Sequence, residues 1–268
     1  MSNSSLAQGF LVKQAGMLSL IQDAGRFGAF NLGLTNGGPV DLLAFQWANR
    51  LCRNTLNATA IEISIGGLIL IAQVDTTLAI TGANMPLTIN GQTKGLWRSY
   101  HVKAGDEIAA TQGVRCYLAV ADGFNITPSF GSTATVCREG IGGLRGEKLL
   151  AGDMLACTCR DSHQNTHNNS YKNKNLILIE KLRPAYTDEI ILHTVPSYQQ
   201  RHFTSYQQRL FFSTEYTVSK SFDRMGYRLE GQAITCDVEG ILSEGICHGA
   251  VQIPADGQPI VLLNDRQT

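Results

Sequence analysis

The sequence has little charge, no net charge and no long apolar run. Charged residues make up 16% of the 268 residues, against about 25% in an average soluble domain. Because 22 Lys and Arg balance 22 Asp and Glu, no basic field exists to cover phosphates, and we exclude a nucleic-acid-binding protein. The longest apolar stretch, residues 65–72, is far shorter than the roughly 20 residues that a membrane span needs. We therefore expect neither nucleic acid nor membrane as a partner.

The seven cysteines form no C-x-x-C pair and no regular framework. A free cysteine in an apolar context, such as VRCYLAV, behaves as a small buried hydrophobe, so we predict a reducing cytoplasm without disulfides. Cys157, Cys159, His163 and His167 could supply four zinc ligands. However, the two histidines stand in an Asn/Ser-rich segment and the cysteine spacing is not that of a structural site. We predict no metal.

Several common catalytic motifs are also missing. No glycine is followed by lysine, which excludes a Walker A phosphate loop, and no methionine is followed by lysine, as at a biotin attachment site. Neither H-E-x-x-H nor G-x-S-x-G occurs. The glycine spacing of residues 140–146 does not fit a dinucleotide loop. We therefore expect no cofactor bound on this chain.

What the sequence does contain is many glycines, 27 in all, and short apolar segments bounded by Gly, Asn and Asp. These segments predict strands at 10–13, 67–72, 77–81, 87–90, 116–121, 176–180 and 260–263. One clear helix is predicted over 39–52, with Pro39 at its first position and an apolar face of Leu43, Ala44, Trp47, Ala48 and Leu51. A weaker helix is predicted over 204–212. The fold class is mainly β with a few helices.

The chain divides at a polar stretch without aliphatic residues. Residues 161–175, DSHQNTHNNSYKNKN, are typical of a linker. We predict a first unit over 1–160 and a second over 176–268. A faint internal echo, in which Glu62 and Glu244 are each followed sixteen residues later by an apolar strand, suggests that the two units are related.

Polar residues gather in glycine-rich turns of the first unit. Two glycines before a helix expose backbone N–H groups that can bind an anion. The same Gly-Gly-Pro sequence could equally be only a tight turn, with its aspartate complementing the helix dipole. The candidates are Gln22, Asp23, Arg26, Gly37, Gly38 and Asp41.

A second polar group lies near the end of the sequence. Arginine offers a planar fork to a carboxylate or phosphate, while Asp and Glu can act as general bases or orient those arginines. A solvated β surface would also carry such charges, but in a chain poor in charge their density favours a site. The candidates are Asp223, Arg224, Tyr227, Arg228, Ser243, Glu244, Asp265, Arg266 and Gln267.

These segments resemble the KipA / allophanate hydrolase subunit 2 family. The resemblance begins with LSLIQDAGRFGAFNLGLTNGGPVDLLAFQWANRL at 18–51 and continues in the family's order. The later segments are IEISIGGLILIA, LAITGAN, CYLAVADGF, GSTATVCREGIGGLRGEKLLAGD, SFDRMGYRLEG and ILSEGICHGAVQIPADGQPIVLLNDRQT. Only the first few residues and 157–175 lie outside the match.

The resemblance implies two cyclophilin-like β-barrel units and a role as the C subunit of a bacterial ATP-dependent 5-oxoprolinase. Such a protein pairs with a B subunit of the KipI / allophanate hydrolase subunit 1 type and acts with an A subunit of the LamB/YcsF type. The complex uses ATP to open the lactam of 5-oxoproline to glutamate. Arg224 or Arg228 would then hold the substrate carboxylate, while Asp23, Glu244 or Asp265 would handle the ring amide or position water.

Two other functions stay open. The same pair of domains, fused, forms the carboxyltransferase part of biotin-dependent urea carboxylase. A third possibility is a non-enzymatic antagonist of a KipI-type sensor-kinase inhibitor. Family members usually continue after NDRQT with a Thr-Gly-Gly-Tyr segment and a closing strand, so we expect the second unit to lack its end, to expose a sheet edge and to be catalytically incomplete.

Overall fold

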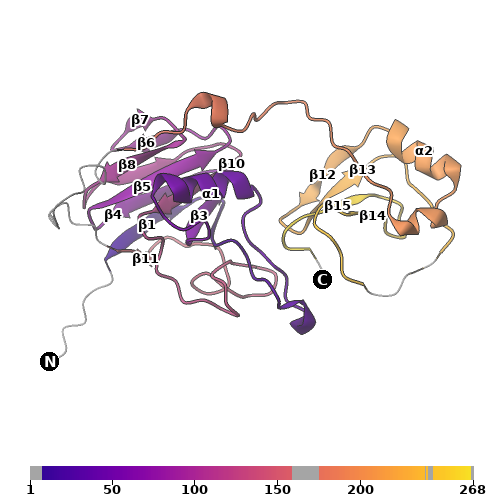
Figure 1. Cartoon of the computed structure of the whole chain (residues 1–268), viewed down its shortest axis with the longest axis horizontal. Helices are drawn as coiled ribbons and strands as arrows, with labels where there is room; N and C mark the ends of the chain where they lie inside the picture. Colours follow the sequence, from indigo (N-terminus) through magenta and orange to yellow (C-terminus); the bar gives the residue numbers. More distant parts are fainter. Residues whose placement is uncertain (1–7, 159–174, 239, 241–243, 267–268) are drawn as a thin grey trace. The chain divides into compact units, whose positions relative to one another are not determined.

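The computed structural model describes residues 8–158, 175–238, 240 and 244–266 (Figure 1). By its internal contacts the chain forms two units: Met1–Phe27 with Gly37–Tyr186, and Gly28–Asn36 with Thr187–Thr268. Residues 176–186 thus belong with the first unit and residues 28–36 with the second. The unit boundaries at 160 and 176 stay a prediction, and the predicted linker lies almost entirely outside the described residues.

Two antiparallel sheets build the first unit (Figure 1). The six-stranded sheet has the order β11-β1-β4-β9-β6-β7 and the five-stranded sheet the order β2-β3-β10-β5-β8. Their strands are β1 (Gly9–Ala15), β2 (Leu18–Gln22), β3 (Ala60–Ser64), β4 (Leu68–Ala72), β5 (Thr76–Gly82), β6 (Leu87–Ile89), β7 (Gln92–Lys94), β8 (Arg98–Val102), β9 (Glu107–Ala110), β10 (Arg115–Val120) and β11 (Met154–Ala156).

The two sheets share one apolar core. Phe10 and Leu70 from the six-stranded sheet lie in the same buried cluster as Ile61 and Ile80 from the five-stranded sheet. Since successive residues of a strand point to opposite faces, each of these strands places only alternate residues in this cluster. The core between the sheets is the main stabilising feature of the first unit.

Helix α1 (Leu42–Leu51) covers the other face of the five-stranded sheet. Its buried Ala44, Phe45 and Ala48 form a second cluster with Tyr117 and Ala119 of β10. Their neighbours along β10 face the core between the sheets, so both faces of this sheet are buried. The consequence for the site is that Tyr117 lies under α1.

The start of α1 corrects our prediction. We expected Pro39 at the first helical position, but the helix begins at Leu42 and Asp41 is its N-cap, accepting from the Ala44 amide at 2.9 Å. Gly37 and Gly38 have positive φ angles of 61° and 87°, and side chains outside the helix hold the amides that follow. The chain therefore cannot become helical earlier.

Leu43 was also wrongly assigned to the apolar face of the helix. It is half exposed, and Phe45 is buried with Ala44, Ala48 and Leu51 instead. The buried arc of α1 is thus turned by about one residue from the one predicted.

The second unit contains one four-stranded antiparallel sheet of order β12-β13-β15-β14. Its elements are α2 (Ser205–Ser213), β12 (Thr217–Phe222), β13 (Gly226–Glu230), β14 (Val251–Gln252) and β15 (Ile260–Leu262), with short 3-10 helices at Phe30–Leu32 (η1) and Tyr198–His202 (η3). Among the described residues its buried apolar side chains are few, chiefly Ile234 and Leu262. The predicted helix at 204–212 is confirmed by α2.

Six of the seven predicted strands are confirmed, by β1, β4, β5, β6, β10 and β15. The strand predicted at 176–180 is wrong. Ile177 makes only an isolated bridge with Arg98, and the chain then enters the 3-10 helix Glu180–Leu182 (η2). The backbone contact with β8 is limited to the Ser99 amide on the Leu176 carbonyl and the Leu178 amide on the Trp97 carbonyl, both at 2.8 Å, and it ends where Trp97, with a φ of 62°, turns the chain before β8.

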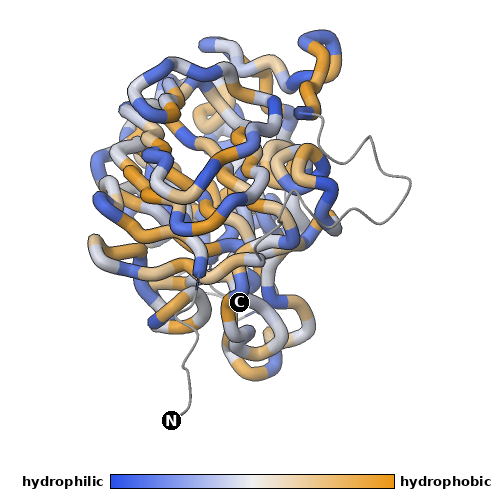
Figure 2. The backbone as a smooth tube through the Cα atoms, turned by 90° about the vertical axis from the view of Figure 1, so that its left-hand side faces the viewer, coloured by the Kyte–Doolittle hydropathy of each residue, from blue (hydrophilic) through white to orange (hydrophobic). Residues whose placement is uncertain are grey.

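The mainly β prediction is confirmed, whereas the barrel description stays a prediction. Figure 2 shows the apolar residues in short stretches divided by polar ones.

In the part of the chain that the structure describes, no helix combines the length and apolar character needed to cross a bilayer. Nor do three His, Cys, Asp or Glu side chains gather there as a metal site would require. The zinc candidates Cys159, His163 and His167 lie outside the described residues.

Candidate functional site

The end of β2 holds three predicted site residues together. The buried Gln22 donates from Nε2 to the Thr135 carbonyl at 3.0 Å and accepts from the Gly38 amide at 3.0 Å. Asp23 accepts from the Ser132 hydroxyl at 2.6 Å and from the Thr133 amide at 2.8 Å. These bonds fasten the loop around residues 129–135 beside the turn that precedes α1.

Arg26 fastens the same loop. Its side chain is 1% exposed and is the largest fully buried side chain among the described residues. The guanidinium donates from Nε to the Ser129 carbonyl and from Nη2 to the Ala134 carbonyl, both at 3.1 Å. A buried arginine held by backbone carbonyls fixes loop geometry, so Gln22, Asp23 and Arg26 form one structural cluster.

The amides of the Gly-Gly-Pro turn point to side chains of the same unit. Besides the Gly38 amide on Gln22, the Val40 amide donates to Glu62 Oε2 at 2.9 Å and the Asp41 amide to the Tyr117 hydroxyl at 2.7 Å. The sequence left two interpretations of these N–H groups open, an anion site and a tight turn before the helix. The geometry assigns them to the placement of α1.

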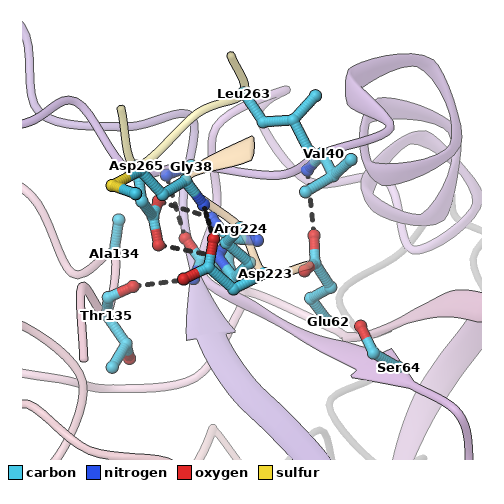
Figure 3. A network of polar contacts seen from close by, with 12 residues as sticks. Gly38, Val40, Glu62, Ser64, Ala134, Thr135, Asp223, Arg224, Leu263 and Asp265 are labelled. Carbon is cyan, nitrogen blue, oxygen red and sulfur yellow. Dashed lines mark hydrogen bonds and ion pairs between the residues drawn. The ribbon is translucent and has the colours of Figure 1, made fainter. Parts of the chain in front are cut away.

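Glu62 lies at the centre of this arrangement, although it was not among the predicted site residues. It stands on β3, is 1% exposed and accepts from the Val40 amide (Figure 3). It also accepts from the Tyr117 hydroxyl at 2.7 Å. The Arg115 guanidinium is 3.7 Å away. Burial, together with the Glu62 charge, raises the pKa of Tyr117 well above its ordinary value, so this hydroxyl keeps its proton.

Asp41 connects this network to the segment after the predicted linker. Its Oδ2 accepts from the Tyr186 hydroxyl at 2.6 Å, while the Tyr186 ring lies 6.4 Å from that of Trp97. Burial first, and then the bond to Asp41, raises the pKa of Tyr186 above its ordinary value. Asp41 therefore acts as a helix cap and an anchor for Tyr186.

In the second unit Arg224 and Asp265 form a bidentate ion pair (Figure 3). Arg224 Nε lies 3.0 Å from Asp265 Oδ2 and Nη2 lies 3.1 Å from Oδ1, and each residue is 7% exposed. The Asp265 amide also donates to the Arg224 carbonyl at 3.0 Å. Such a fork fixes both side chains, so two residues of the second candidate group, which the sequence did not pair with each other, lie in direct contact.

The neighbouring candidates lie around the β12–β13 turn. Asp223 accepts from the Met225 and Gly226 amides at 2.8 and 3.2 Å, which closes the turn. Tyr227 lies half-buried on β13, and Arg228 pairs with Asp256. Asp223 and Arg228 are thus held by structural contacts.

A shallow groove of the second unit brings together two further candidates, Glu244 and Arg266. The exposed Glu244 accepts from the Tyr198 hydroxyl, and from Gln199 Nε2 at 2.8 Å. Arg266 donates from Nε to the Ile246 carbonyl at 2.6 Å. The complete lining is Phe30, Asn31, Glu244, Gly245, Ile246, Cys247 and Arg266.

The structure therefore gathers the candidates into one cluster in the first unit and two in the second. Ser243 and Gln267 lie outside the described residues. Sequence reasoning missed Glu62, Phe30 and Asn31. A lone carboxylate in the apolar strand IEISIGG was a usable signal for Glu62, because charged side chains are rarely buried without a partner. The other two residues carried no local signal.

Comparison with known proteins places the chain in a family. The model of the family "Carboxyltransferase domain, subdomain A and B" matches residues 32–268. The chain is 35% identical to the C subunit of 5-oxoprolinase from Escherichia coli (strain K12), over 95% of this chain and 79% of that protein.

Solved structures give the same fold. The crystal structure of TTHA0988 superposes on this chain with a TM-score of 0.75 and 28% sequence identity. The match covers 100% of this chain and 51% of the TTHA0988 chain. This chain thus spans about half the length of that protein. The crystal structure of the K. lactis urea amidolyase has a TM-score of 0.81, and the match covers 98% of this chain and 17% of the amidolyase chain. At 22% sequence identity this likeness supports the fold alone. The resemblance found in the motifs is confirmed: the chain belongs to the carboxyltransferase domain, subdomain A and B, family.

Proposed function

We propose that this chain is the C subunit of a bacterial ATP-dependent 5-oxoprolinase, which opens the lactam of 5-oxoproline to glutamate together with the A and B subunits. The observation that carries the proposal is the 35% identity to the C subunit of the E. coli 5-oxoprolinase over 95% of this chain. The proposed partners are a B subunit of the KipI type and an A subunit of the LamB/YcsF type.

The proposed reaction is a hydrolysis of an amide. The ring C–N bond breaks, the carbonyl carbon gains the hydroxyl of water and the nitrogen gains a proton, while the complex consumes ATP. No phosphate-loop motif occurs in the sequence, so we assign ATP binding to a partner protein. On this chain the reaction needs groups that hold the substrate carboxylate and others that contact the ring amide.

The contacts of each candidate favour different roles. Asp23 already accepts three hydrogen bonds, from Gly25, Ser132 and Thr133, so we assign it to loop placement and not to proton transfer. Glu244 is exposed and is the better candidate to contact a ring N–H. The Arg224–Asp265 pair would position the groups around it.

Reconstitution tests the proposal. The full-length protein that contains this chain, coexpressed with the A and B subunits of its genome, should release glutamate from 5-oxoproline only when ATP is present, and none of the three should do so alone. Asp265→Asn should lower kcat while the complex still assembles, whereas Asp188→Asn, at an exposed position of the same unit, should leave kcat unchanged. A correctly assembled complex without ATP-dependent glutamate release would sink the proposal.

The description of the matching family favours one second candidate, the carboxyltransferase part of a biotin-dependent urea carboxylase. That function requires a biotin carboxylase and a biotin carrier, which carries the Met-Lys dipeptide missing here. Addition of urea, bicarbonate and a biotinylated carrier to the reconstituted complex separates the two: urea-dependent ATP consumption in place of glutamate release would favour the carboxylase.

A further inference from the structure

The groove of the second unit contains an arginine that no acidic side chain neutralises among the described residues. Arg266 donates from Nε to the Ile246 carbonyl at 2.6 Å and from Nη1 to the Leu263 carbonyl at 3.4 Å. Backbone carbonyls orient the guanidinium without cancelling its charge. A half-buried, oriented and unneutralised arginine at a groove is suited to bind an anionic group.

The other candidate arginines are already paired. Arg224 is forked onto Asp265 and is 7% exposed, and Arg228 pairs with Asp256. To bind a substrate carboxylate, either would have to give up an acidic partner, which costs more than using Arg266, for which the described part of the chain provides no acidic partner. We therefore replace our expectation that Arg224 or Arg228 holds the substrate carboxylate and consider Arg266 instead.

The other residues that line the groove narrow the class of ligand that Arg266 could bind. Glu244 is negative and would repel a ligand with two acidic groups, but it can accept a hydrogen bond from an N–H. Asn31 is exposed and offers both an amide donor and an acceptor. Phe30, 47% exposed, supplies an apolar wall.

The local backbone explains why Phe30 and Asn31 are presented together. They belong to η1 (Phe30–Leu32), which ends at Gly33 with a φ of 73°. A glycine adopts this left-handed conformation without strain, and its amide closes the turn on the Phe30 carbonyl at 2.9 Å. A short rigid turn thus displays both side chains.

We propose that the groove is the substrate subsite of this chain, with Arg266 binding the carboxylate of a small acid whose amide N–H faces Glu244 and Asn31. This inference rests on the proposed function and deepens it, because 5-oxoproline carries one carboxylate and one ring amide. The structure assigns the specificity to Arg266, Asn31 and Phe30, of which the last two carried no signal in the sequence.

Cys247 provides a measurement that does not depend on activity. It is exposed and lines the groove, whereas the exposed Cys236 of the same unit does not. The full chain is alkylated with iodoacetamide, and the rate at each cysteine is read from its peptide by mass spectrometry. The added molecules are 5-oxoproline and 2-pyrrolidinone, the same lactam without the carboxylate.

We expect 5-oxoproline to slow the alkylation of Cys247 and to leave the alkylation of Cys236 unchanged. 2-Pyrrolidinone should protect Cys247 at least about tenfold less well, because it lacks the carboxylate that would contact Arg266. Arg266→Gln should weaken protection by about the same factor, and Asn31→Ala by a smaller one. Arg209→Gln, an exposed arginine on α2 of the same unit, is the matched control and should not change it.

Equal protection by the two lactams, or undiminished protection in Arg266→Gln, overturns the subsite. A changed Cys236 rate in Arg266→Gln would mean that this variant alters the fold. The subsite is then tested by the Asn31→Ala variant and by the comparison of the two lactams on the unaltered chain. An active reconstituted complex whose KM is insensitive to both variants refutes the subsite and leaves the proposed function intact. If 5-oxoproline protects Cys247 but the assembled complex has no activity, the proposed function is refuted and the subsite stands.

Discussion

Glu62 illustrates at the residue scale how a buried charge is made tolerable. Removing a carboxylate from water is costly unless hydrogen bonds replace the lost hydration. Here the Val40 amide and the Tyr117 hydroxyl both donate to Oε2, and Tyr117 in turn accepts from the Asp41 amide. One carboxylate and one phenol thereby satisfy two amides that the start of α1 would otherwise leave buried.

Tyr117→Phe should therefore destabilise the first unit by about 1–3 kcal/mol, because Glu62 loses a donor and the Asp41 amide loses its acceptor. The measurement is urea unfolding followed by tryptophan fluorescence. Tyr100→Phe is the control: its hydroxyl makes a single bond, to the Gly95 carbonyl, at the surface, and the cost should stay near about 0.5 kcal/mol. Equal losses in the two variants would contradict this account of Glu62.

At the scale of elements, side chains rather than strand pairing close the turn between β8 and β9. Asp106 accepts from the Lys103 amide at 2.8 Å and from Asn90 Nδ2 at 2.7 Å. Asn90 in turn accepts from the Glu107 amide at 2.8 Å. The turn between β8 and β9 is thereby linked to Asn90, which directly follows β6 of the six-stranded sheet.

This turn gives the first unit a pH-dependent contribution. Burial alone would raise the pKa of Asp106, but the bonds from Lys103 and Asn90 and the nearby positive charges outweigh it, and the pKa is lowered. A lowered pKa means that the folded state favours the carboxylate. The stabilisation is therefore present at neutral pH and is lost as the pH falls below the ordinary Asp value, about 4.

Asp106→Asn should accordingly lower the free energy of unfolding at pH 7 by about 1 kcal/mol, and the difference from the unaltered protein should shrink toward pH 3. Urea titrations at several pH values measure it, with Asp188→Asn as the exposed control. A difference that stays constant from pH 7 to pH 3 would rule out the carboxylate as its cause.

At the scale of the whole molecule, neither unit is a continuous stretch of sequence. Residues 176–186 complete the first unit: the Leu178 amide donates to the Trp97 carbonyl at 2.8 Å, and the Leu178 side chain is buried in the cluster under α1. The short segment with η1 belongs in the same way to the second unit. Stability of the first unit therefore depends on residues that follow the predicted linker.

Leu178→Ala should cost the first unit about 2–4 kcal/mol, as expected for removing a buried leucine. Both tryptophans of the sequence, Trp47 and Trp97, lie in this unit, so the fluorescence midpoint in urea reports it selectively. Leu192→Ala, at a position 72% exposed in the second unit, should leave this midpoint unchanged. A midpoint unaffected by Leu178→Ala would show that the segment is not part of the first unit.

The sequence by itself determined the mainly β class, six of the fifteen strands of the described residues and the approximate positions of both α-helices, because apolar periodicity and capping act over a few residues. It also identified Arg224 with Asp265, and Gln22 with Asp23 and Arg26, as groups of polar residues near turns. Only the tertiary structure decided what each group does.

Those decisions depend on contacts between residues distant in the chain. Tyr117 lies 55 positions from Glu62, and Asp265 lies 41 positions from Arg224. Strand register and loop packing bring such partners together, and they decide which charges are already satisfied. Local patterns cannot express this, so Arg224 and Arg266 look equivalent in the sequence, whereas the fold neutralises the first with a carboxylate and leaves the second oriented toward a groove.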